Sequence, residues 1–120
     1  MPDDQLPPHD SAAEAGALAC VLSASSPELF AQLNREQFYD LRNREIFTAL
    51  ECLNLDGKPL NVVSLTQWLT AKERVRDAGG MEYVGSLPDK TPSTEHFPVF
   101  LETLKDCQTR RAIMHDTQQL

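Results

Sequence analysis

Residues that typically begin or end helices occur at intervals along the sequence. In the segments between these residues, apolar side chains recur every three or four positions. The start signals are Ser11 with Glu14 as a capping box, Ser26 followed by a proline, and Asn61. No alternation of apolar and polar residues extends beyond three positions, so strands are not expected. The pattern therefore predicts an all-α fold.

About five short helices and one long C-terminal helix are expected. In chain order they are a helix from Ser11 to the serine-rich residues 23–26, a short helix after Ser26, a helix from Leu41 to Asp56, a helix after Asn61, a short helix around Val84 and a helix from residue 94 to the last residue. A turn at residues 34–40 is expected to place Phe38 and Tyr39 against the core. The Gly79-Gly80 pair permits a second sharp turn.

Three segments follow from this pattern. Residues 1–9 contain three prolines and two acids and have nothing to pack, which predicts a flexible arm. Residues 10–93 carry the short helices and form a helical head domain, and residues 94–120 form the long helix.

The charge balance and the cysteines limit the classes of function. Eighteen acidic against eleven basic residues give the 120-residue chain a net charge of −7, which argues against autonomous binding to DNA through phosphates. The sequence has no apolar run long enough to span a membrane and no secretory signal. Cys20, Cys52 and Cys107 form no Cys-x-x-Cys pair and suit reduced thiols. The chain is therefore expected to be cytoplasmic, without a membrane contact.

No group of residues has the spacing that catalysis or cofactor binding requires. The Gly57-Lys58 pair is followed by Pro59, which removes an N–H group that a phosphate-binding loop would need. The three histidines are scattered, and no nucleophile motif surrounds a cysteine. We therefore expect no catalytic residues, no metal site and no cofactor in this chain.

Basic side chains form three clusters that are interleaved with acids. They are Arg42 with Arg44, Lys72 with Arg74 and Arg76, and Lys105 with Arg110 and Arg111. Interleaving favours a solvated face over a phosphate contact or a protein contact. Trp68 lies at core spacing, which favours packing in the core over a platform for stacking bases.

The long helix carries a narrow apolar seam. In a heptad frame its members are Phe97, Phe100, Leu104, Cys107, Arg111 and Met114. Such a seam needs a partner, which is the globular part of the same chain, another chain, or residues beyond Leu120. We expect self-association through this seam, most simply as a symmetric dimer.

Seven blocks of sequence follow one another along nearly the whole chain. They are Pro7-Pro8-His9-Asp10, the helix from Ala13-Glu14 through Leu18 to Val21-Leu22, Phe38-Tyr39, Arg44-Glu45-Ile46-Phe47, Gly57-Lys58-Pro59-Leu60-Asn61, Gly79-Gly80-Met81-Glu82-Tyr83-Val84 and Thr91-Pro92-Ser93. Their order and spacing resemble the N-terminal domain of DnaB-type replicative DNA helicases. The sequence departs from that family's pattern at Ala17, Ala19 and Cys20 and at Pro98.

The resemblance implies a non-catalytic collar above a ring of motor domains. In the family a helical head is followed by a helical hairpin, of which residues 96–120 resemble the first arm. Heads and hairpins pair between subunits into dimers and a hexamer, and a DnaG-type primase or a helicase loader docks on them. ATP, Mg²⁺ and DNA would be bound by the motor domain. The alternatives are a stand-alone adaptor or loader-like replication protein, an independent DNA-binding module and a small enzyme.

Overall fold

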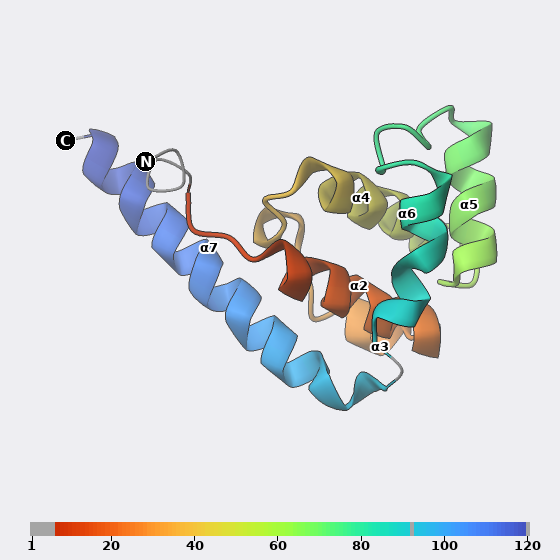
Figure 1. Cartoon of the computed structure of the whole chain (residues 1–120), viewed down its shortest axis with the longest axis horizontal. Coiled ribbons are helices and arrows are strands. Elements are labelled where there is room, and N and C mark those ends of the chain that lie inside the picture. Colours follow the sequence, from red (N-terminus) through yellow and green to blue (C-terminus); the bar gives the residue numbers. More distant parts are fainter. Residues whose placement is uncertain (1–6, 92, 120) are drawn as a thin grey trace.

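The computed structural model describes residues 7–91 and 93–119, with side chains up to residue 114. Its α-helices are α2 (Ser11–Ala24), α3 (Pro27–Phe30), α4 (Leu41–Leu55), α5 (Val62–Ala71), α6 (Met81–Ser86) and α7 (Phe97–Gln119), with 3-10 turns η1 (Arg35–Gln37), η2 (Leu87–Lys90) and η3 (Thr94–His96). These residues form helices and turns without a strand (Figure 1), which confirms the predicted all-α fold of five short helices and one long helix. Pro92 of the block Thr91-Pro92-Ser93 and Leu120, the predicted end of the long helix, lie outside the described residues.

Most of the helix starts follow the predicted caps. The side chains of Ser26 and Asn61 each accept a hydrogen bond from the backbone N–H three residues later, as expected. The prediction that Ser11 and Glu14 form a capping box is wrong. Asp10 caps α2 instead, because it lies one residue earlier and its carboxylate accepts the N–H of Ala13 at 3.0 Å. Glu14 is thereby free to turn into the core.

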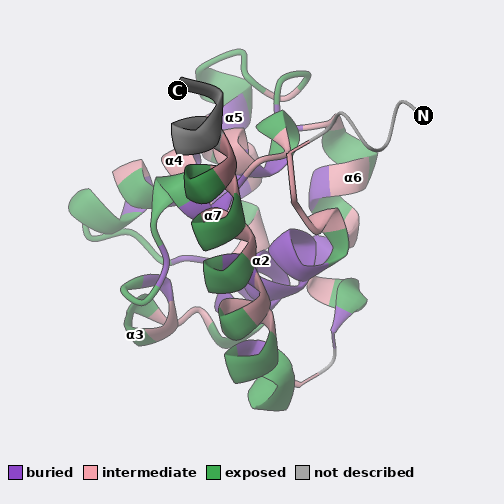
Figure 2. Ribbon diagram, turned by 90° about the vertical axis from the view of Figure 1, so that its left-hand side faces the viewer, coloured by how far each residue is buried: buried purple, intermediate pink, exposed green. Residues whose placement is uncertain are grey.

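Helix α2 is the centre of the molecule. Every residue from Ala13 to Leu22 is buried, because α3, α4, α7, η2 and η3 all pack around it. Figure 2 shows this helix as a buried element behind the exposed surface of α7. A helix that is apolar on all sides is stable only in such a position, and the run of alanines allows its neighbours to approach closely. The sequence pattern had indicated only one apolar face.

The remaining helices close the head around α2. Phe47 of α4 lies between Phe30 and Phe38, with ring centroids 4.9 and 5.4 Å apart respectively. Phe38 is therefore in the core, as predicted, and Tyr39 is half-buried. Gly79 and Gly80 have φ angles of 99° and 93°, which glycine adopts without strain, and they turn the chain into α6.

Helix α7 lies diagonally across one side of the head and passes α2 with its N-terminal half (Figure 1). Pro98 falls in its first turn, where a backbone N–H has no partner within the helix, so the proline is tolerated. Among the described residues no helix is both long and apolar enough to cross a membrane.

Candidate functional site

The predicted seam of α7 faces the chain's own head. Phe97 and Leu104 are 2% and 0% exposed, and the other four members, Phe100, Cys107, Arg111 and Met114, are half-buried. Of the three partners that the sequence left open, the structure therefore supplies the first, the globular part of the same chain. Burying a side chain such as Phe97 or Leu104 is worth roughly 1.5–3 kcal/mol, so these two residues offer no free surface to a second chain. Self-association of the chain stays a prediction.

Helix α7 approaches the head closely at Gly16. The ring of Phe100 lies over this glycine, and a Cβ atom there would be 2.6 Å from the tip of the ring. A larger residue at position 16 would therefore push α7 away from α2.

Farther along α7, Arg111 joins the helix to two distant segments. Its guanidinium donates hydrogen bonds to the carbonyl oxygens of Pro8, at 2.9 Å, and Glu36, at 2.7 Å. It also lies 5.8 Å from the ring centroid of Tyr39, on which the ring of His9 packs at 4.5 Å. The expectation that residues 1–9 pack against nothing is therefore wrong for residues 7–9. Residues 1–6 lie outside the described part of the chain.

Another side of α7, about a third of a turn around the helix from the seam, is largely open in the single chain. Val99 and Ile113 are 59% and 61% exposed at the two ends of a stripe that runs through the half-buried Thr103 and the exposed Asp106 and Arg110. Residues at these three- and four-residue steps share one side of a helix. Figure 2 shows exposed residues along this side of α7. We call these five residues the outer stripe.

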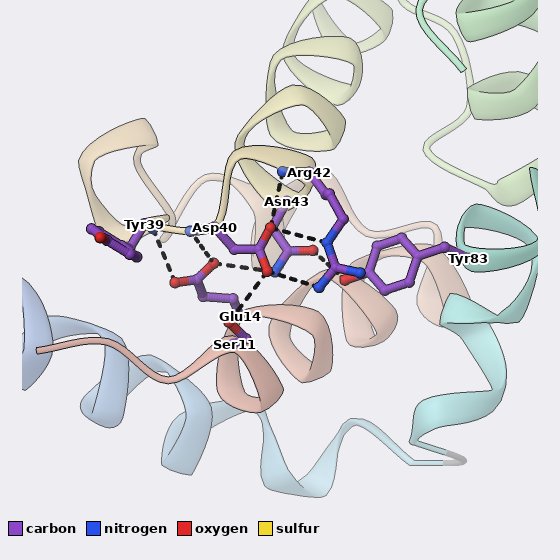
Figure 3. A network of polar contacts seen from close by, with 7 residues as sticks. All are labelled: Ser11, Glu14, Tyr39, Asp40, Arg42, Asn43 and Tyr83. Carbon is purple, nitrogen blue, oxygen red and sulfur yellow. Dashed lines mark hydrogen bonds and ion pairs between the residues drawn. The ribbon is translucent and has the colours of Figure 1, made fainter. Parts of the chain in front are cut away.

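A buried carboxylate holds the loop that carries Tyr39 (Figure 3). Glu14 is 0% exposed, and its Oε2 accepts the Tyr39 N–H at 2.9 Å. Its Oε1 accepts the Asp40 N–H at 3.2 Å and the side-chain amide of Asn43 at 3.1 Å. Burial raises the pKa of Glu14, while these three hydrogen bonds oppose the rise. Tyr83 completes the network, since its hydroxyl donates to Oδ1 of the Asn43 side chain.

A second carboxylate borders this network. Asp40 accepts two hydrogen bonds from the guanidinium of Arg42, at 3.1 and 2.8 Å, and one from the hydroxyl of Ser11 at 3.2 Å. The Arg42 side chain lowers the pKa of Asp40. The same guanidinium lies 4.3 Å from the ring centroid of Tyr83. The network therefore ties α2, α4 and α6 together and positions residues 39 and 40.

The roles of Asn43 and Tyr83 were not predicted from the sequence, and Glu14 was assigned to a helix cap. One available signal was the position of Glu14 inside an otherwise apolar run from Ala13 to Leu22. An acid in such a run is buried and needs several hydrogen-bond donors.

The predicted solvated face is confirmed for two arginines of the basic clusters, Arg74 and Arg110. Arg74 lies 2.6 Å from Glu45 and 3.4 Å from Asp77, and Arg110 lies 3.0 Å from Asp106 on the next turn of α7. These contacts lie on the surface, where ion pairs contribute little to stability.

Comparison with known proteins agrees with the fold. The sequence model of the family described as "DnaB-like helicase N terminal domain" matches residues 6–106. The replicative DNA helicase DnaB of Pasteurella multocida is 31% identical over 113 residues, which cover 92% of this chain and 23% of that protein. The DnaB helicase of Nostoc sp. is 29% identical over 115 residues, which cover 92% of this chain and 13% of that protein. The chain therefore spans less than a quarter of the length of either relative.

A solved structure shows the same arrangement of helices. The crystal structure of the N-terminal domain of DnaB helicase from Mycobacterium tuberculosis superposes with a TM-score of 0.84, over 95% of this chain and 81% of that chain, at 22% sequence identity. The ordered sequence blocks, the helical fold and the match of the family model over most of the chain agree with one another. The chain belongs to the family of DnaB-like helicase N-terminal domains.

Proposed function

We propose that this chain is a non-catalytic collar domain at the N-terminus of a replicative DNA helicase, where it joins helicase subunits to one another. The observation that carries the proposal is the division of α7 into two sides. The inner side is docked on the head through Phe97 and Leu104, while the outer stripe is exposed over most of the helix. A helix that is already fixed by one side can present the other to a second chain without first becoming ordered.

The outer stripe has the composition of a weak, self-complementary contact. Val99 and Ile113 are 14 positions apart, which corresponds to about 21 Å along a helix. Asp106 lies at the midpoint with Arg110 one turn later, so opposite charges of two chains can meet near a two-fold axis. This stripe replaces the buried seam as the surface through which we expect dimers to form, and hexamers in the full-length protein.

The rest of the proposed function is based on the similarity of this chain to its relatives. Both named relatives are replicative DNA helicases, and this chain matches a small part of each. We therefore propose that the full-length protein is a cytoplasmic ATP-dependent helicase whose motor domain binds ATP, Mg²⁺ and DNA. The collar itself holds no cofactor and receives a DnaG-type primase or a helicase loader.

Sedimentation tests the self-association of the chain. Across a concentration series we expect the wild type to shift from monomer to dimer, and Ile113→Asp to stay monomeric because a carboxylate would then replace an apolar residue at the end of the outer stripe and lose its water in the contact. Leu55→Asp is the matched control, since Leu55 is 82% exposed at the end of α4 and the substitution is chemically the same. Equal behaviour of the two variants, or a wild type that stays monomeric at the highest concentration, would contradict the proposal.

The native reading frame separates the collar from the stand-alone adaptor. A phosphate-binding loop encoded beyond residue 120 would support the helicase, whereas a stop codon directly after that residue would favour the adaptor. Magnesium-dependent ATP turnover by the purified chain would contradict a non-catalytic role for either.

A further inference from the structure

The two halves of α7 are attached to the head by different means. The N-terminal half inserts Phe97 and Leu104 into the core and packs Phe100 over Gly16. Between Leu104 and Met114 no described side chain of the helix is fully buried. The C-terminal half is instead connected to the head by the hydrogen bonds of Arg111. The first attachment is part of the core, whereas the second lies at the border of the head, where Arg111 is only half-buried.

We infer that Arg111 is a releasable clamp that sets the direction of the C-terminal half of α7 against the head. The clamp consists of the Arg111 guanidinium, the carbonyl groups of Pro8 and Glu36, and the packed rings of Tyr39 and His9, which are tilted by 31°. It joins three segments that are distant in the sequence: residues 7–9 before α2, which we call the strap, the turn of residues 35–40 before α4, and α7. The inference concerns one chain and does not depend on self-association.

Arginine suits this position because its planar head carries several N–H groups that point in fixed directions. Nη1 serves the strap and Nη2 serves the turn, so one side chain satisfies two acceptors on different segments. A lysine could place its charge there but has no planar fork with which to bridge them. The guanidinium also lies near the Tyr39 ring, where a cation is favoured.

The head side of the clamp is held rigidly. Glu14 accepts the N–H groups of Tyr39 and Asp40, which fixes the loop that presents the Tyr39 ring. On the strap side, the His9 ring packs on Tyr39 in a tilted arrangement, and its Nδ1 lies 2.8 Å from the carbonyl oxygen of Pro7 within the strap itself. Opening is therefore expected to move the strap and α7 together, away from a loop that stays in place.

The consequence concerns the outer stripe. Ile113 follows Arg111 by two positions, so the direction in which this end of the stripe faces depends on whether the clamp is closed. The clamp thus couples the N-terminal strap to the direction in which α7 presents its exposed side.

Hydrogen exchange of the whole chain tests the clamp. In Arg111→Met we expect the amides of residues 105–114 to exchange about tenfold faster than in the wild type, because that half of α7 undocks. Methionine and arginine are similar helix formers, so helix propensity does not explain such a change. Lys105→Met is the matched control, since it removes a positive charge from an exposed position of the same helix that lies outside the outer stripe. Arg111→Lys should fall between the wild type and Arg111→Met.

A deletion of residues 1–9 provides the second measurement. If Arg111 acts through the strap, the substitution Arg111→Met should accelerate exchange by less than about threefold in the deleted background, because part of its target is already gone. Equal exchange in Arg111→Met and Lys105→Met would overturn the inference. Acceleration that includes the amides of α2 to the same degree would also overturn it, since release of the clamp leaves the core closed.

Discussion

Removing the carboxylate of Glu14 should be among the most destabilising single changes on a charged residue of this chain. Three donors depend on it: the N–H groups of Tyr39 and Asp40 and the side-chain amide of Asn43. In Glu14→Ala all three lose their acceptor inside a site that excludes water, because Glu14 is 0% exposed. A buried donor without a partner costs about 1–3 kcal/mol. Part of this cost is offset because a desolvated charge is also removed.

We therefore expect Glu14→Ala to lower the free energy of unfolding by about 3–5 kcal/mol, a large part of the 5–15 kcal/mol typical of a domain. Glu14→Gln should cost less, about 1–3 kcal/mol, because one carbonyl oxygen remains as an acceptor. Its NH₂ group would face either the Tyr39 N–H or the donors at Asp40 and Asn43, so at least one donor is left unpaired.

Urea unfolding followed by circular dichroism measures these free energies, and the fluorescence of Trp68, the single tryptophan, checks that the transition has two states. Glu51→Ala is the control, because Glu51 is exposed on α4 and its loss should change stability by less than about 0.5 kcal/mol. A free energy for Glu14→Ala within about 0.5 kcal/mol of that control would refute the role assigned to the network.

Three further predictions concern the same packing. Burial raises the pKa of Glu14 in the folded chain above its value in the unfolded chain. The free energy of unfolding of the wild type should therefore exceed that of Glu14→Gln most at a pH below the unfolded pKa, and the difference should fall as the pH rises through the folded pKa. Unfolding measured from acid to neutral pH checks this, and a difference that stays constant would contradict it. Gly16→Ala should destabilise the chain by about 1–2 kcal/mol, because its Cβ meets the ring of Phe100. Gly85→Ala should stabilise it by up to about 1 kcal/mol, because Gly85 has open space around it in α6. Thermal melts that rank the two variants the other way would be inconsistent with close docking of α7. Deleting residues 1–9 should lower the melting temperature, because His9 contacts Tyr39 and Pro8 contacts Arg111. Deleting residues 1–6 should leave it nearly unchanged. Equal melting temperatures of the two deletion variants would show that the strap contributes nothing to stability.

Local signals in the sequence predicted the helices well. Ser26 and Asn61 act as caps, Gly79 and Gly80 turn the chain, and Phe38 enters the core, because each of these outcomes depends on a few neighbouring residues. The family could also be predicted from the sequence, because seven short blocks that are each weak evidence become specific when they occur in a fixed order. These features require no knowledge of which helices meet.

The site depends on contacts between distant segments, and here the sequence pattern was insufficient. The apolar seam of α7 was detected, but periodicity does not say whether the partner is the same chain or another. Arg111 was placed on the seam without its targets, which lie 103 and 75 positions earlier in the chain. Glu14 was assigned to the nearest helix start, because local capping is the usual role of an acid there, while the donors that hold it belong to residues 39–43.

The claim that the exposed side of α7 joins two chains is tested most directly by cross-linking at its midpoint. In a background with Cys20, Cys52 and Cys107 replaced by serine, Asp106→Cys places one thiol at the centre of the outer stripe. A symmetric pair brings the two copies of this position together whether the helices run parallel or antiparallel, and neighbouring helices pack about 8–10 Å apart. We predict that mild oxidation converts Asp106→Cys into a disulfide-linked dimer while Leu55→Cys, on the far end of α4, stays monomeric. Equal cross-linking of both variants, or of neither, would contradict the account.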